Sequence, residues 1–263
     1  MRLAVVTAIA VLASAPYAAA QATIKPVGPG TPVPPQAHHA SAPAKGPTER
    51  VIVSVNASYL TASRTFDDTR TFDLYAETAS FTSHYAVEPS AGIDAGAIVR
   101  IWKGLGAGVA FTSYSDSRDI DIDASLPHPL KFNSPRTMTG TAAGDHEETA
   151  VHLEFAYIIP IGAKVSAVIF GGPSFFTVKQ SVVTAVQRNE AYPFDEVTFS
   201  GATVTTEDES TKGFNVGADV AWYFTKNVGV GGIVRFSSAT ATFSLGDVDA
   251  GGALVGGGVR LRF

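Results

Sequence analysis

The sequence predicts an all-β fold, an eight-stranded antiparallel barrel that spans a membrane. Three observations predict it. Apolar and polar residues alternate along eight segments, short and long connections alternate between these segments, and the last segment carries arginines on one face only. Side chains of a strand alternate between its two faces, so a period of two indicates strands with different surroundings on each side. Lipid on one side and a filled polar interior on the other produce this pattern.

The C-terminal segment 251–263 shows the pattern most clearly. Phe263, Leu261 and Val259 share one face, and Arg262 and Arg260 share the other. A soluble protein rarely ends in a strand with a wholly apolar outer face. The closing strand of a membrane barrel has this character.

Seven further segments alternate in the same way, and each has roughly the nine to eleven residues that a tilted spanning strand needs. They are 51–59, 93–101, 105–112, 151–159, 165–176, 214–224 and 228–236. The segment 165–176 is apolar on both faces, and we expect Val165, Ala167 and Ile169 to point outward.

Connection lengths predict how the strands are arranged. Short connections lie at 103–104, 160–163 and 225–227, and longer ones lie at 63–90, 118–146, 179–211 and 244–250. Membrane barrels have short periplasmic turns and long extracellular loops. We expect β-structure within the long loops, projecting beyond the lipid. The alternative is a barrel of ten strands, in which 63–90 supplies two more spans.

Aromatic residues lie near both ends of the predicted strands, as the two interfaces of a bilayer favour. Those near the short turns are Trp102, Tyr157, Trp222, Tyr223, Phe224 and Phe263, and those toward the long loops are Tyr59, Phe111, Tyr114 and Phe236.

The N-terminal part is read as processing and linker sequence. Residues 1–20 have a positive start, an apolar stretch and small residues before Gln21, which predicts a cleaved signal peptide. Residues 21–49 contain seven prolines and predict an extended periplasmic linker before a barrel domain at 50–263. No later run of eighteen apolar residues predicts a spanning helix, so a chain that meets lipid must close its sheet into a barrel.

Composition excludes several classes of function. The 263 residues carry a net charge of -5, which does not fit a polybasic nucleic-acid binder, and they include no cysteine, which excludes a thiol enzyme and a disulfide scaffold. We expect no cofactor.

The region 50–263 resembles the small outer-membrane β-barrel group that includes the OmpA transmembrane domain, OmpX and OmpW. The signal peptide, the Gly-rich hairpin over 97–109 and the ending Val259-Arg260-Leu261-Arg262-Phe263 carry the resemblance. It implies an outer-membrane protein of a diderm bacterium, surrounded by outer-membrane lipid. It also implies that the barrel-assembly machinery recognises the last strand through Phe263, Leu261 and Val259. Full-length OmpA has a peptidoglycan-binding domain after its barrel, and for this sequence, which stops at Phe263, we expect none.

Strand alternation places a set of charged residues inside the barrel, where they must pair because an unpaired buried charge is costly. The predicted lumen network is Asp94, Arg100, His152, Glu154, Asp219, Arg235, Arg260 and Arg262. An eight-stranded barrel is just wide enough to be filled by its own side chains, so we expect a closed lumen. A narrow channel for small solutes is the alternative.

Enzymatic and metal-binding functions have weaker support. His152 and Glu154 share an inner face and could orient each other in a lipid-modifying enzyme, but spacing places no serine beside them. Asp119, Asp121 and Asp123 would share a face and are a weak candidate for Ca²⁺, although Ala124 and Leu130 stand where an EF-hand needs Gly and Glu. We therefore predict a non-enzymatic barrel, without metal, with a structural role or a surface-interaction role through extracellular ligands of its long loops.

Overall fold

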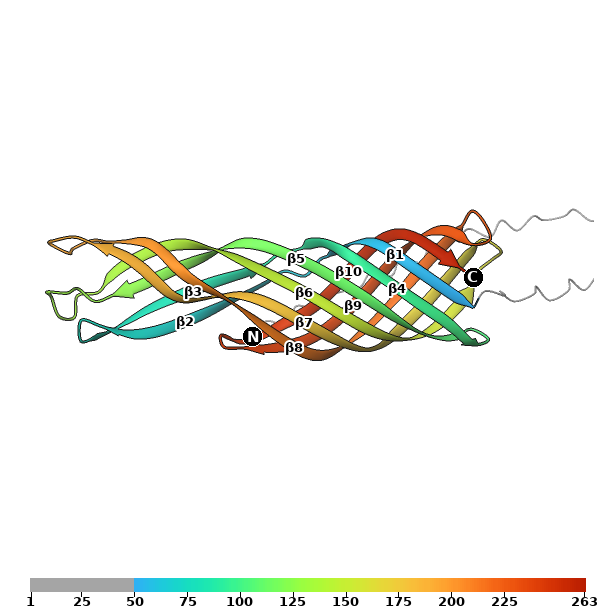
Figure 1. The fold of residues 1–263 in the computed structure, drawn as a ribbon, viewed down its shortest axis with the longest axis horizontal. Helices are drawn as coiled ribbons and strands as arrows, with labels where there is room; N and C mark the ends of the chain where they lie inside the picture. The colour runs from blue at the N-terminus through green and yellow to red at the C-terminus, as the bar shows by residue number, and fades with distance from the viewer. Residues whose placement is uncertain (1–49) are drawn as a thin grey trace, which may run out of the picture. The chain divides into compact units, whose positions relative to one another are not determined.

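The computed structural model describes residues 50–263, and the predicted signal peptide and linker lie outside the described residues (Figure 1). The described chain is built from ten strands. They are β1 (Val51–Leu60), β2 (Arg64–Leu74), β3 (Glu77–Val87), β4 (Ser90–Trp102), β5 (Leu105–Leu126), β6 (Arg136–Pro160), β7 (Val165–Glu190), β8 (Val197–Tyr223), β9 (Val228–Phe243) and β10 (Gly246–Arg262). Across 50–263 we find no helix with the length and apolar character needed to cross a membrane.

Eight of these strands form a closed antiparallel ring, which confirms the predicted eight-stranded barrel. The order around the ring is β1, β4, β5, β6, β7, β8, β9 and β10. The ring closes where β1 pairs with β10, from Ile52 opposite Arg262 to Leu60 opposite Leu254. The C-terminal strand thus has the closing position that its sequence predicts.

The segment 63–90 forms a hairpin outside the ring and does not add two spans. β2 pairs only with β3, and β3 pairs with the far half of β5 from Ser80–His84 to Asp121–Ser125. The near half of β5 pairs with β4 instead, from Leu105 to Tyr114. The hairpin therefore lies beside the far half of β5, beyond the end of its pairing with β4. Its two strands do not enter the ring, and this argues against the ten-stranded alternative.

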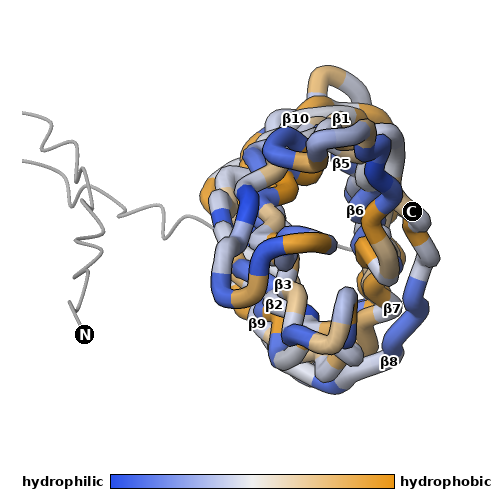
Figure 2. The backbone as a smooth tube through the Cα atoms, turned by 90° about the vertical axis from the view of Figure 1, so that its left-hand side faces the viewer, coloured by the Kyte–Doolittle hydropathy of each residue, from blue (hydrophilic) through white to orange (hydrophobic). Residues whose placement is uncertain are grey.

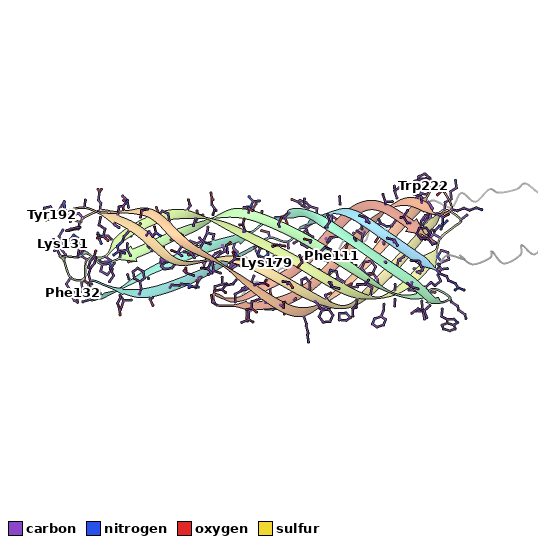
Figure 3. The ribbon with its side chains drawn as sticks, viewed as in Figure 1. Phe111, Lys131, Phe132, Lys179, Tyr192 and Trp222 are labelled. Atoms are coloured by element: carbon purple, nitrogen blue, oxygen red, sulfur yellow. The ribbon has the colours of Figure 1, made fainter. Side chains whose placement is uncertain are left out.

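The outer face of the ring is apolar over a limited height. At the end with the short connections, which we call the turn end, Trp102, Tyr157, Trp222, Phe224 and Phe263 are exposed. A second ring of exposed aromatics consists of Tyr59, Phe111, Phe175, Phe214 and Phe236. Figure 3 shows Trp222 at the turn end and Phe111 midway along the strands. We call the surface between the two rings the apolar band.

The predicted aromatic belts are wrong for two residues. Tyr114 and Tyr223 are 7% and 1% exposed, because each follows an outward-facing residue and so points into the barrel. Val165, Ala167 and Ile169 do face outward, since Ser166, Val168 and Phe170 between them are buried.

Beyond the second aromatic ring, β5, β6, β7 and β8 continue for many residues, and their outward side chains become polar. On β5, for example, Phe111 is followed on the same face by Ser115, Ser117 and Asp119. We call this part the distal extension and define it as residues 61–92, 115–149, 177–212 and 237–252. The predicted loops 118–146 and 179–211 are thus largely strand, as expected from their β-prone sequences.

Closure of the ring depends on a glycine that lets β10 approach β1. A Cβ added to Gly258 would overlap the carbonyl oxygen of Val55 and lie 2.8 Å from Cα of Asn56. A Cβ added to the neighbouring Gly257, which points outward, would meet nothing closer than the carbonyl oxygen of Gly231 at 3.6 Å.

We predict that Gly258→Ala destabilises the folded barrel by about 1–3 kcal/mol through overpacking at the closing pair of strands. Urea unfolding in lipid vesicles, followed by heat-dependent gel mobility, measures the loss. Gly257→Ala is the matched control and should leave the unfolding midpoint unchanged. Equal midpoints for the two variants would contradict the proposed role of this close approach.

Candidate functional site

The barrel interior at the height of the apolar band holds a buried network of charges. Arg235 on β9 lies at its centre and is paired with two carboxylates, Asp94 on β4 at 3.1 Å and Glu154 on β6 at 2.8 Å. Arg235 Nη1 also donates to Asn215 Oδ1 at 3.3 Å. The side chains of Arg235, Asp94 and Glu154 are at most 3% exposed. A charge buried this deeply is stable only when an opposite charge is paired with it.

A second arginine joins this network through an amide. Arg260 on β10 is paired with Asp219 on β8, and its Nη1 donates to Asn56 Oδ1 at 2.6 Å. Asn56 Nδ2 in turn donates to Asp94 Oδ1 at 2.8 Å. The network therefore connects β1, β4, β6, β8, β9 and β10 across the lumen.

The two other predicted arginines lie near the turn end. The Arg262 guanidinium stacks 3.8 Å from the centre of the Tyr223 ring, and its Nε donates to the carbonyl oxygen of Lys226 at 2.8 Å. Arg100 and Arg262 line one small hollow beside Tyr223.

His152 takes a different place from the one that a catalytic pair with Glu154 requires. Its Nε2 lies 3.0 Å from Thr112 Oγ1, and its Nδ1 lies 2.7 Å from Ser174 Oγ, to which Asn215 also donates at 3.0 Å. Sequence reasoning missed Ser174 because the segment 165–176 is apolar on both faces. The available signal was the alternation along the strand. Ile169 was expected to point outward, so Ser174, an odd number of residues further on, points inward.

The Ser174–His152 pair has the composition of an activated nucleophile but not the access. Both residues have no exposed surface, and both lie in the interior of the ring. A nucleophile must reach its substrate within hydrogen-bond distance. The arrangement therefore works as a satisfied polar core and gives no route for a lipid substrate.

Arg64, the first residue of β2, closes the end of the lumen that lies next to the distal extension. Its guanidinium reaches across to Glu148 on β6 at 2.7 Å and donates to the carbonyl oxygens of Asp249 and Gly251. Glu148 also accepts from the Gly251 amide at 2.8 Å and contacts His146 at 2.9 Å. Burial alone would raise the pKa of Glu148, but the His146 hydrogen bond and the Arg64 charge hold it below its ordinary value.

Above this closure the distal extension has its own apolar core. Phe81 and Tyr85 of β3, Ile122 and Leu126 of β5 and Val183 of β7 are almost completely buried there. Phe66 and Phe72 of β2 and Phe199 of β8 pack against them. Figure 2 looks along the strands and shows apolar and polar positions interleaved around the wall. The extension is thus a packed element and not a set of loose loops.

The three aspartates considered for Ca²⁺ lie on the outside of this extension. Asp119, Asp121 and Asp123 are exposed on β5, and Asp123 lies 3.2 Å from His84 Nε2. The other ring nitrogen of His84 lies 2.7 Å from Asp67 on β2. Within residues 50–263 no group of three or more His, Cys, Asp or Glu side chains is arranged to hold a metal ion.

The pairing of charges in the lumen network determines how much the barrel loses when Arg235 is replaced. Arg235→Met should destabilise the barrel by about 3–5 kcal/mol, because Asp94 and Glu154 remain buried without their cation. Urea unfolding in vesicles measures the change. The triple variant Arg235→Met, Asp94→Asn, Glu154→Gln removes all three charges and should recover at least half of the loss. A triple variant as unstable as the single one would contradict the pairing argument.

The contact of His84 with Asp67 makes the stability of the β2–β3 hairpin depend on pH. The hydrogen bond to Asp67 outweighs partial burial and, with the smaller effect of Asp123, raises the pKa of His84 above its ordinary value. The stabilisation of the hairpin is therefore present in full below the ordinary pKa and is lost as the pH rises through the raised value. An NMR titration of the His84 ring should give an apparent pKa above about 6.5.

Asp67→Asn should lower that pKa, and Asp73→Asn, on the same outer face of β2, is the control. An unshifted His84 in the unsubstituted protein, or equal effects of both variants, would contradict the assignment.

Comparison with known proteins gives a likeness of fold. No protein-family model and no curated protein matches the chain. Among solved structures, similar ones include Ail, the attachment invasion locus protein of Yersinia pestis, with 11% identity over 81% of this chain and 99% of that one and a TM-score of 0.37. Neisserial surface protein A has 13% identity over 81% and 97%, with a TM-score of 0.42.

OprG from Pseudomonas aeruginosa has 10% identity over 83% of this chain and 97% of its own, with a TM-score of 0.43. These structures are small outer-membrane β-barrels, the group that the sequence resembles. With TM-scores this low, the barrel assignment rests on the strand pairings of the chain itself, and the site residues are interpreted from their own geometry.

Proposed function

We propose that this protein is an integral outer-membrane β-barrel that is not an enzyme and that carries a rigid extension outside the cell for contacts with ligands or surfaces. The apolar band between two aromatic rings supports a place in a bilayer. The predicted signal peptide and the C-terminal strand ending in Phe263 support export and barrel assembly. Under this proposal the turn end faces the periplasm and the distal extension faces outward.

The packed core of the distal extension carries the proposal. An anchor needs only the height of the apolar band, yet β5 to β8 continue beyond it and the β2–β3 hairpin is added beside them. Phe81, Ile122 and Val183 are buried at that level. Burial of such side chains stabilises the extension independently of lipid, so its length serves to hold the distal loops at a fixed distance from the membrane.

The filled lumen supports a non-conducting barrel over a channel. Arg235 and Arg260 cross the interior at the apolar band, and Arg64 crosses it above. A solute would have to break paired, buried charges at two levels, and then pass the apolar core of the extension.

The negative charge of the distal extension disfavours anionic ligands. Its defined ranges contain 20 Asp and Glu against 8 Lys and Arg, a net charge of -12, whereas the whole chain has -5. One of the similar structures, Ail, is described in complex with the heparin analogue sucrose octasulfate. A polysulfated ligand would be repelled by the acidic extension of this chain, so we propose neutral or cationic partners.

The test combines permeability with topology. Folded, heat-modifiable protein in liposomes should give no osmotic swelling with small sugars. On intact cells a cysteine introduced at the exposed Thr203 of the extension should react with a membrane-impermeant maleimide, whereas one introduced at Lys226 of the turn end should react only after lysis. Swelling by the folded form would replace this proposal with a channel. Protection of the extension from labelling in intact cells would reverse the orientation and remove the surface role.

A further inference from the structure

The far end of the distal extension exposes large apolar side chains. Leu130 and Phe132 lie in the β5–β6 connection and Tyr192 lies in the β7–β8 connection, and they are 67%, 74% and 81% exposed. Figure 3 shows Phe132, Lys131 and Tyr192 together at the end opposite Trp222. We define the tip as residues 75–77, 127–136 and 188–196.

A buried arginine ties the loops of the tip to one another. Arg136 Nη2 donates to the carbonyl oxygen of Pro127 at 2.7 Å and contacts Glu190 at 3.2 Å, and its Nη1 donates to the carbonyl oxygen of Phe194 at 3.0 Å. The Tyr75 hydroxyl donates to the same Glu190 carboxylate at 3.2 Å. One charged pair thus joins all three connections.

Further bonds fix the loop that carries Phe132. The Asn133 amide donates to Glu77 at 3.0 Å, the Leu130 amide donates to His128 Nδ1 at 3.0 Å, and Lys131 is paired with Asp195 of the neighbouring loop. The exposed apolar side chains therefore stand on a framework that is already ordered. A partner that covers them has little backbone entropy left to remove.

The charge of the tip differs from that of the rest of the extension. The tip contains 4 Asp and Glu against 3 Lys and Arg, a net charge of -1, and the remainder contains 16 against 5, a net charge of -11. Most charges of the tip are used within it, as in the Lys131–Asp195 and Arg136–Glu190 pairs. The tip is a nearly neutral apolar cap on an acidic support.

The same residue chemistry occurs at the opposite end of the molecule, where the chain meets the edge of the apolar band. There Trp102 is exposed beside Lys103, whose ammonium lies 4.8 Å from the ring centre. At the tip Phe132 is exposed next to Lys131 in sequence, and the Lys131 ammonium is paired with Asp195. Aromatic and aliphatic side chains next to a lysine suit the headgroup region of a bilayer. A neutral cap favours an uncharged surface, and the acidic support disfavours an anionic one.

We propose that the tip inserts Leu130, Phe132 and Tyr192 into the surface of a zwitterionic lipid bilayer that faces the membrane holding the barrel. This inference rests on the proposed function, since it needs the extension to point outward. It adds the partner class and the side chains that make the contact. Because the chain is anchored at one end, the two ends would then hold two membranes at the length of the extension.

The experiment uses the full folded protein in lipid nanodiscs, mixed with phosphatidylcholine vesicles and separated by flotation. The unsubstituted protein should float with the vesicles, and empty nanodiscs should not. The variant Leu130→Ser, Phe132→Ser, Tyr192→Ser should bind at least about 10-fold more weakly, since burial of even one such side chain is worth that factor. The matched control Thr137→Ser, Thr139→Ser, Thr203→Ser changes three exposed residues of the same extension and should bind as the unsubstituted protein does.

Vesicles that also contain phosphatidylserine should bind less at low salt, because the acidic support repels them. Equal flotation of the serine tip variant, or no flotation of the heat-modifiable unsubstituted protein, overturns the proposal. Nanodiscs that associate with each other through the tip, without vesicle binding, overturn it in favour of a second copy of the chain. Failure here, with liposomes still impermeable and the extension still labelled on intact cells, removes only the lipid partner and leaves the surface role intact.

Discussion

Every feature of this structure depends on the pairing of backbone groups around a closed ring. In hydrocarbon an unpaired N–H or C=O costs several kcal/mol, so the sheet cannot keep a free edge at the height of the apolar band. The pairing of β1 with β10 removes both edges at once. Gly258 permits the close approach that this pairing needs, and the strand that carries it also carries Arg260 into the lumen. Closure and the polar core are therefore encoded in the same short segment.

Closure also determines what the interior can do. A ring of eight strands leaves room for side chains and little else, so the charges that alternate inward must satisfy one another. Arg235, Arg260 and Asn56 connect six strands in this way. The Ser174–His152 contact shows the consequence for chemistry, since a pair that elsewhere would suggest a nucleophile is here enclosed and fully hydrogen-bonded. The stability of this pair and its inaccessibility to solvent have the same cause.

The sequence predicts the ring far better than the extension because alternation is informative only where the two faces meet different surroundings. Along Val151 to Ile159 the outer face meets lipid and the inner face meets the network, and the predicted facing agrees with the structure. For Tyr114 and Tyr223 the prediction was wrong. A tyrosine near a strand end suggested the membrane interface, whereas the alternation along the strand places both side chains in the interior. Arg64 and Arg136 act through partners distant in sequence, and nothing local distinguishes them from surface residues, whereas Ser174 had only its parity to mark it. The signal peptide and linker predictions fall on residues 1–49, which the structure does not describe.

The distribution of charge gives the extension a direction as well as a length. Its acidic outer face repels neighbouring acidic chains and keeps the extension solvated, and like charges along a shaft oppose its collapse onto an anionic membrane surface. A tip with the same negative charge would also be repelled and could not come close to such a surface. Pairing Lys131 with Asp195 and Arg136 with Glu190 removes the charge only at the end, where Phe132 and Tyr192 are exposed. Attraction is thereby confined to one place on the extension, and this confinement makes an end-on contact the geometry that the electrostatics favour.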